Sequence, residues 1–151
     1  MIRRIAAAAV VLAAFAAAPA LADTSGSVKL SGTVALSCSV AVTDNNASLN
    51  ILSGSSNITV GAVVETCNDG AGYTITVTSA NGGSLKSSAN GAQPVSYTTI
   101  YDGQSATGTV NVSRSSAQFG KQATIAVTVP ANAQAIAGSY SDTLTVTIQG
   151  K

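Results

Sequence analysis

Apolar residues or glycine occupy every second position from Val28 to Val42, and the positions between them are small, hydroxylated or charged. This alternation is typical of a β-strand with one buried face. A single strand over residues 28–42 would extend roughly 50 Å, which exceeds the ~36 Å diameter of a compact domain of this size. We therefore expect either a bend at Gly32 or an arm that leaves its own domain and fills a partner.

Further along the chain, short apolar stretches alternate with turn-forming residues such as Asn, Asp and Gly, and helical periodicity is absent. This pattern predicts one all-β domain, a sandwich or a barrel. The expected strands cover residues 49–52, 58–67, 73–78, 95–101, 109–112, 123–129 and 140–149. Residues 80–94 are polar and rich in glycine, which indicates a long turn or a weak edge strand.

The last expected strand has a clear apolar phase, and the sequence ends shortly after it. In a seven-strand immunoglobulin-like sandwich one more strand would follow at this point. We therefore expect an edge that is naturally open or that borrows a strand.

Residues 1–22 have the features of a secretory signal peptide, with Arg3 and Arg4 before an apolar run and a small-x-small pattern ending at Ala22. Its removal leaves five basic residues against six acidic ones, a net charge near −1. Such a balance predicts no binding to nucleic acid or to an anionic membrane. No other apolar run is long enough to span a bilayer, so we expect no membrane insertion after cleavage.

Cys38 and Cys67 are the only cysteines. In an exported chain an even pair indicates one disulfide. The alternative, a metal or redox pair, would need ligands that the sequence does not offer, because it contains no histidine and no Cys-x-x-Cys motif.

Several segments resemble a known group of proteins. Residues 31–40 (SGTVALSCSV) are similar to the opening strand of chaperone–usher fimbrial subunits, and residues 137–148 (AGSYSDTLTVTI) are similar to the closing strand of the spore coat protein U branch, which includes archaic-type pilins. Between them, residues 65–68 (ETCN), 72–77 (GYTITV) and 95–102 (VSYTTIYD) follow in the expected order.

This resemblance implies an incomplete immunoglobulin-like β-sandwich over residues 35–151 that is completed by donor-strand exchange. The donor would be the N-terminal segment 23–34, with Val28, Leu30 and Val34 as apolar knobs and Gly32 where the groove admits no side chain. The implied acceptor edge lies opposite the first strand and consists of Tyr140, Leu144, Val146 and Ile148. The implied partners are like subunits, a periplasmic chaperone and an outer-membrane usher. The implied function is that of a structural subunit of a pilus, fimbria or coat at the cell surface, serving adhesion or biofilm formation.

Two alternatives remain open at the level of sequence. Gly32 is also compatible with a kink in one internal strand that crosses between the sheets, in which case Val28 and Leu30 are ordinary core residues. The chain would then be a self-contained secreted domain that binds carbohydrate or another surface ligand. Tyr97 and Tyr101 share one phase and offer a possible stacking platform for a sugar, although such a pair more often packs in a core.

Catalysis and cofactors have little support in the sequence. Histidine is absent, and the acidic residues are spread over turns instead of being paired. Asp44, Asp69 and Asp102 offer oxygen ligands for calcium, but no glutamate follows at the spacing of an EF-hand loop. We predict that the protein is not an enzyme and holds no cofactor.

Overall fold

The computed structural model describes residues 25–151, and the predicted signal peptide, residues 1–22, lies outside the described residues. The chain divides into two units, residues 1–33 and residues 34–151. In the first unit, the described residues 25–33 contain neither helix nor strand, and all of them are exposed. In the second unit, all of the regular structure is β-strand. The described residues contain no helix that is long and apolar enough to cross a membrane.

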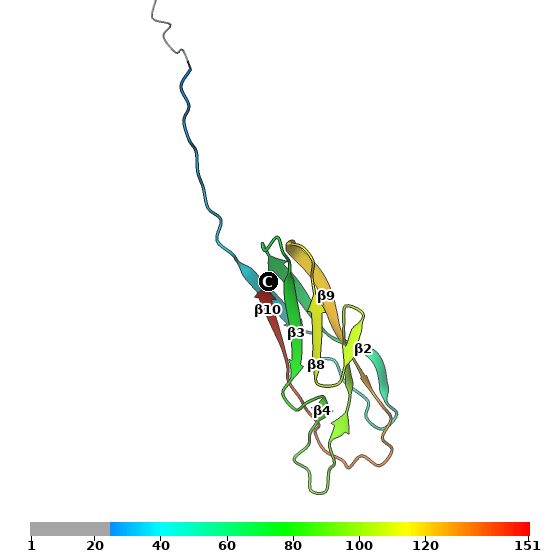
Figure 1. Cartoon of the computed structure of the whole chain (residues 1–151). Helices are drawn as coiled ribbons and strands as arrows, with labels where there is room; N and C mark the ends of the chain where they lie inside the picture. The colour runs from blue at the N-terminus through cyan, green and yellow to red at the C-terminus, as the bar shows by residue number, and fades with distance from the viewer. Residues whose placement is uncertain (1–24) are drawn as a thin grey trace, which may run out of the picture. The chain divides into compact units, whose positions relative to one another are not determined.

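Ten strands build the second unit (Figure 1). They are β1 (Cys38–Asp44), β2 (Ser55–Cys67), β3 (Tyr73–Ser79), β4 (Ser84–Leu85), β5 (Val95–Ser96), β6 (Thr98–Tyr101), β7 (Gln104–Ala106), β8 (Thr109–Ser113), β9 (Gln118–Val129) and β10 (Leu144–Gly150). One sheet has the order β1-β2-β9-β6-β7, a second has the order β10-β3-β8, and β4 pairs with β5. All pairings are antiparallel.

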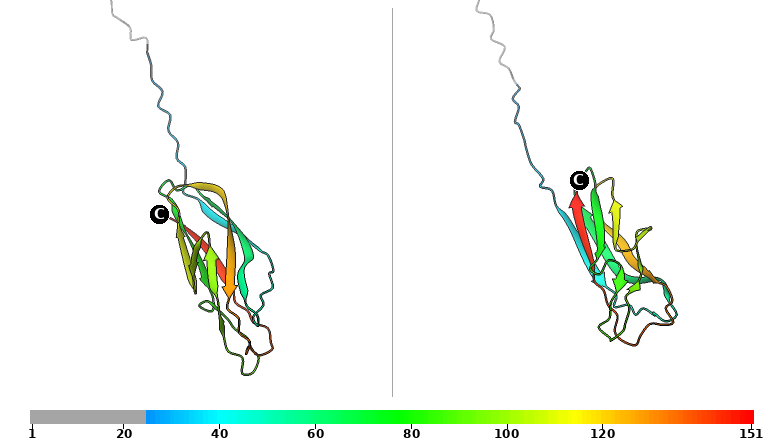
Figure 2. Two further views of the ribbon diagram at one scale, coloured as in Figure 1. Left: turned by 90° about the vertical axis from the view of Figure 1, so that its right-hand side faces the viewer. Right: turned by 60° about the horizontal axis from the view of Figure 1, so that its bottom comes forward.

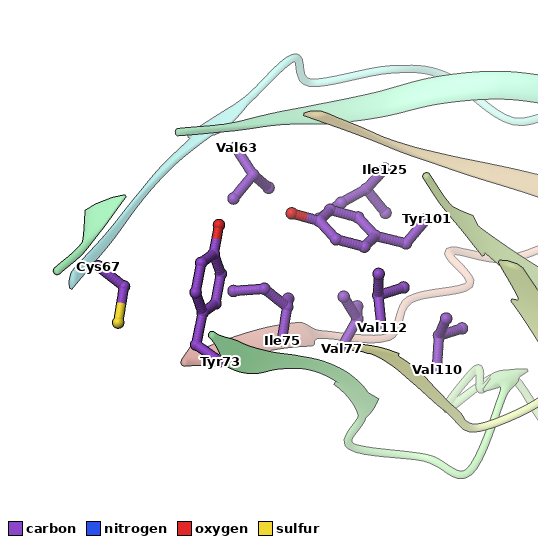
Figure 3. Packing of buried hydrophobic residues seen from close by; sticks show 9 residues of the cluster. All are labelled: Val63, Cys67, Tyr73, Ile75, Val77, Tyr101, Val110, Val112 and Ile125. Atoms are coloured by element: carbon purple, nitrogen blue, oxygen red, sulfur yellow. The ribbon is translucent and has the colours of Figure 1, made fainter. Parts of the chain in front are cut away.

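The two larger sheets form a sandwich around one main core. The five-stranded sheet contributes Val63, Tyr101 and Ile125, and the three-stranded sheet contributes alternate residues of β3 and β8, namely Ile75, Val77, Val110 and Val112 (Figure 3). On β3 the alternation is nearly complete, since Tyr73, Ile75 and Val77 are buried and the residues between them are more exposed. The period-2 pattern of the sequence therefore defines the core face of this sheet.

The strand order is that of an immunoglobulin-like sandwich. The order β1-β2-β9-β6 reproduces the A-B-E-D sheet of that fold, and β10 beside β3 reproduces strands F and C. The next position, strand G, would lie on the outer edge of β10. This strand order confirms the predicted all-β immunoglobulin-like fold. Within residues 25–151 no strand occupies the position of strand G, so β10 is an edge strand.

The alternation at residues 28–42 is interrupted in the structure, because β1 begins only at Cys38 and residues 25–37 are not in a strand. Two sequence predictions are wrong in detail. Residues 49–52 are also not a strand, although Leu49 and Ile51 pack against a smaller core cluster. The last strand begins at Leu144, four residues later than predicted, with a single bridge between Lys86 and Ser141 before it.

Two further boundaries differ from the prediction. The segment 95–101 is divided at Tyr97 into β5, which pairs with β4, and β6, which joins the five-stranded sheet. Strand β9 begins at Gln118, five residues earlier than predicted, and Gly120 adopts a positive φ of 78° beside the register shift between Glu65 and Thr66. A bulge of this kind lets an irregular sequence remain in a ladder.

The predicted disulfide joins Cys38, the first residue of β1, to Cys67, the last residue of β2. The two residues are also register partners, so the bond holds edge strand β1 against its only strand neighbour among the described residues.

Reduction of this disulfide should lower the free energy of unfolding of the mature protein by about 3–4 kcal/mol, because the bond closes a loop of 29 residues. Urea unfolding with and without reductant, with the Cys38→Ser/Cys67→Ser variant as a control for the reductant itself, measures this loss. An unchanged midpoint after reduction would contradict it.

Candidate functional site

The outer edges of β1 and β10 form the most open part of the sandwich. Each strand pairs on one side only, β1 with β2 and β10 with β3, and no backbone hydrogen bond joins the two edges within residues 25–151. The two strands lie side by side at the margins of the two sheets (Figure 2), and their Cα atoms approach within 8 Å. We use the term groove for the margin of the sandwich along these two unpaired edges.

Apolar side chains on both edges face the groove and are incompletely covered. On β10 these are Leu144, Val146 and Ile148, which are half-buried and pack against the main core. On β1, Val40 packs in the same way, whereas Val42 is 51% exposed although it lies opposite the buried Val63. An edge that combines unpaired backbone groups with apolar side chains is a template for another strand.

The groove deepens into a pocket of about 290 Å³ beside the start of β10. Its walls come from both sheets and from the short β4–β5 sheet, and include Val42, Val60, Leu85, Val127 and Leu144. Apolar walls from several elements suit an apolar side chain from outside the sandwich.

Asp142 fixes the chain at the rim of this pocket. Its carboxylate accepts hydrogen bonds from Ser79 Oγ at 2.5 Å and Tyr97 Oη at 2.7 Å, and from the backbone N–H groups of Asn81 and Thr143 at 3.0 and 2.7 Å. Burial acts to raise the pKa of Asp142, but these hydrogen bonds outweigh it and lower that pKa. For Tyr97, burial first and the contact with Asp142 next raise the pKa to about 12. The segment before β10 is therefore held in place without any strand on its outer side.

The structure places the predicted acceptor residues in two different surroundings. Leu144, Val146 and Ile148 lie along β10, as the sequence pattern predicts. Tyr140 does not, because it precedes the strand and its hydroxyl donates to the carbonyl oxygen of Ile136 at 2.9 Å. The assignment of Tyr140 to the strand edge is therefore wrong.

The predicted donor residues lie in the exposed N-terminal part of the described chain. Val28 and Leu30 are 85% and 90% exposed, so they are not core residues of this sandwich, and the hypothesis of a kinked internal strand is wrong for them. Val34 is also exposed. A Cβ atom added to Gly32 would meet no atom within 4 Å, so the free chain places no steric limit on a side chain at this position.

Asn68 holds the residues that lead into β1. Its side-chain oxygen accepts from the backbone N–H of Ser37 at 2.7 Å, and its amide nitrogen donates to the carbonyl oxygen of Ala35 at 2.8 Å. Its own backbone N–H donates to the carbonyl oxygen of Ser37 at 3.1 Å. Because Asn68 follows the disulfide-bonded Cys67, residues 35–37 are fixed to the same end of the sandwich as the disulfide.

A buried ionic cluster lies in the core near that end, and sequence reasoning missed it. Glu65 is fully buried and accepts from Tyr73 Oη at 2.6 Å, Tyr101 Oη at 2.5 Å and Arg114, whose Nε and Nη2 donate at 2.9 and 2.6 Å. Figure 3 shows the two tyrosine hydroxyls directed into the same part of the core. Arg114 also pairs with Asp102.

The charges in this cluster stabilise one another. Burial acts to raise the pKa of Glu65, but hydrogen bonds from Arg114 and the two tyrosines outweigh it and lower that pKa below the ordinary value of 4.5. Burial and the contact with Glu65 raise the pKa of Tyr73 to about 12 and raise that of Tyr101 further. Glu65, ionised at neutral pH, thus links both sheets to Arg114. The sequence signal was one acidic residue in the inward phase of a strand, between Val63 and Cys67.

The hypothesis of a sugar-stacking platform is wrong. Tyr97 is 4% exposed and Tyr101 is fully buried, and the hydroxyl of each is bound to a carboxylate inside the sandwich. Residues 25–151 contain no group of three or more His, Cys, Asp or Glu side chains that could hold a metal ion.

No protein-family model matches the sequence, and no curated protein is significantly similar to it. Among solved structures, the fold is similar to the crystal structure of the Escherichia coli Hda pilus minor tip subunit, HdaB. The TM-score is 0.39 at 11% sequence identity, and the match covers 73% of this chain and 79% of that chain. Since this similarity is low, the argument for a function rests on the groove and the exposed N-terminal residues.

Glu65 should make the stability of the sandwich depend on pH. Because the folded state lowers its pKa, the stabilisation is complete above the ordinary value of 4.5 and is lost as the pH falls through the lower, folded-state pKa. Urea unfolding from pH 3 to pH 7 measures this loss. Glu65→Gln should cost about 3–5 kcal/mol at pH 7, because it leaves Arg114 without its buried partner, and should flatten the profile below pH 5. An equally steep profile in the variant would contradict the assignment.

Proposed function

We propose that this protein is an exported structural subunit of a surface fibre of the chaperone–usher type, which assembles by donor-strand complementation. The N-terminal arm of one subunit, residues 23–34, would lie in the groove between β1 and β10 of the next. Its role in adhesion or biofilm formation would be mechanical and without catalysis. A periplasmic chaperone would cover the groove before assembly, and an outer-membrane usher would receive the subunit.

The observation that carries this proposal is that the same chain contains an unpaired strand edge and an exposed segment with the alternation of a β-strand. The sandwich has an open position beside β10 with incompletely covered apolar side chains, and the arm has exposed apolar side chains at alternate positions. Adding the arm as a strand would supply the backbone pairing that the edge lacks. Each of Val28, Leu30 and Val34 would contribute up to ~1.5–3 kcal/mol on burial.

Gly32 is a further observation in favour of this contact between the arm and the next subunit. The free chain would accept any side chain at this position, and Gly32 does not adopt a positive φ. A glycine in the apolar phase of an exposed segment is accounted for if the wall of the partner's groove comes close to the backbone at that point. The disulfide supports export, because such bonds form in oxidising compartments.

Leu30→Asp should abolish assembly, because it would place a charge in the apolar groove of the next subunit. Ser31→Asp is the matched control, since the neighbouring residue points away from the groove in an alternating strand and the added charge is the same. After co-expression with a cognate chaperone, samples are run on SDS gels without boiling. We expect a heat-sensitive ladder for the wild type and for Ser31→Asp, and monomers for Leu30→Asp. Equal ladders for the two variants, or no wild-type ladder, would contradict the proposal.

Gly32→Val should leave the monomer unchanged and weaken the polymer. The exposed arm tolerates the side chain, so the thermal unfolding midpoint of the variant monomer should equal that of the wild type to within about 1 °C. The heat-sensitive ladder should dissociate at a lower temperature, whereas Ser31→Val, which adds the same side chain on the other face, should retain it. A ladder that is equally stable with Gly32→Val would show that the groove imposes no limit at this position.

A further inference from the structure

Phe119 is the most exposed aromatic residue among residues 25–151. It is 76% exposed although it lies near the start of β9, where its neighbours in the ladder are Thr66 and the disulfide-bonded end of β2. It is therefore at the end of the sandwich from which the arm departs, about two strand spacings, or roughly 10 Å, from the start of β1. The pocket lining and the cores described above do not include it.

A second pocket lies at the opposite end of the sandwich. It measures about 440 Å³ and is formed by the loop after β1 and the segment before β10, with Leu49, Ile51, Leu52, Ile136 and Tyr140 as its larger apolar side chains. The backbone N–H of Asn132 donates to the carbonyl oxygen of Ile51 at 2.8 Å, so the loop that follows β9 is attached to this pocket. We call it the pole pocket. Figure 2 shows both segments at the end of the sandwich away from the C-terminus.

Phe119 cannot reach the pole pocket of its own subunit. The ten residue steps of β9 from Phe119 to Val129 extend roughly 33 Å. The pole pocket is, however, adjacent to the pocket at the start of β10, because Leu49 lines both. A neighbour whose arm occupies the groove therefore arrives at the edge of the pole pocket.

The direction of the arm decides which end of the neighbour arrives there. Every pairing in both sheets is antiparallel, so a strand added to β10 in the same manner begins near Gly150 and ends near Leu144. Only residues 35–37 then separate Val34, the end of the arm, from Cys38 of the neighbour, and these four residue steps span at most ~14 Å. Asn68 also fixes residues 35–37 to the end that carries Phe119.

We propose that Phe119 of each subunit inserts into the pole pocket of the subunit whose groove holds its arm. The partner is a second copy of this chain, and the inference rests on the proposed function because the arm brings the two surfaces together. The contact would bury an exposed aromatic ring against Leu52 and Ile136, both of which are exposed in the free subunit. It would add a second, rigid attachment to a joint otherwise made by one strand.

A cysteine pair tests this contact directly. In the mature protein with its native disulfide, the double variant Phe119→Cys/Leu52→Cys should form bonds between successive subunits after assembly and mild oxidation. These bonds would give a ladder that survives boiling without reductant and collapses with it. The control Thr124→Cys/Leu52→Cys, which moves the thiol to an exposed position further along β9, should give only the heat-sensitive ladder.

The outcomes separate the contact from the joint itself. A heat-sensitive ladder without the covalent one would overturn the contact and leave donor-strand assembly intact. The absence of any ladder from the wild type would overturn both. As a second measurement that adds no thiol, Phe119→Asp should lower the temperature at which the ladder dissociates, whereas Gln122→Asp should not, and the unfolding midpoint of the monomer should be equal in both. Equal dissociation temperatures would again overturn the contact.

Discussion

The unpaired outer edge of β10 is the feature on which the other properties of this sandwich depend. Strand β10 has β3 on one side and no strand on the other within residues 25–151. Its inward side chains Leu144, Val146 and Ile148 therefore complete one wall of the core while remaining partly accessible. A long apolar edge of this kind promotes uncontrolled association unless it is covered or filled by a specific strand.

Several interactions fix the segments that border this edge and leave its outer side unpaired within residues 25–151. Asp142 binds Ser79 and Tyr97 immediately before β10, and the Cys38–Cys67 disulfide fixes the opposite wall of the groove. The ionised Glu65 joins the two sheets through Tyr73, Tyr101 and Arg114. These polar and covalent links stabilise a sandwich that lacks the apolar contacts of a strand beside β10. In the proposed assembly, strand addition to an edge fixed in this way would cost less conformational entropy.

The sequence was informative wherever local pattern and burial agree. Strands β3 and β8 were predicted because their alternation is uninterrupted and turn residues border them. Strand β2 was predicted from Ile58 onward, although its inward phase changes at Gly61. The pattern at residues 28–36 is equally regular, yet it does not say which body covers the apolar face, and the structure leaves that face exposed. At residues 140–143 the same phase continues, but regular pairing is reduced to a single bridge between Ser141 and Lys86, and the side chain of Asp142 binds Ser79 and the backbone of Asn81. Glu65 could not be interpreted from sequence, because Arg114 lies 49 residues away from it.

Hydrogen exchange followed residue by residue in the monomer and in the assembled protein tests the central claim most directly. In the monomer we predict rapid exchange of the amides of residues 25–34 and of those β10 amides that face away from β3. In the assembled protein both sets should become protected together, because they would then form one ladder. Protection of the arm in the monomer, or continued rapid exchange of both sets after assembly, would contradict the account.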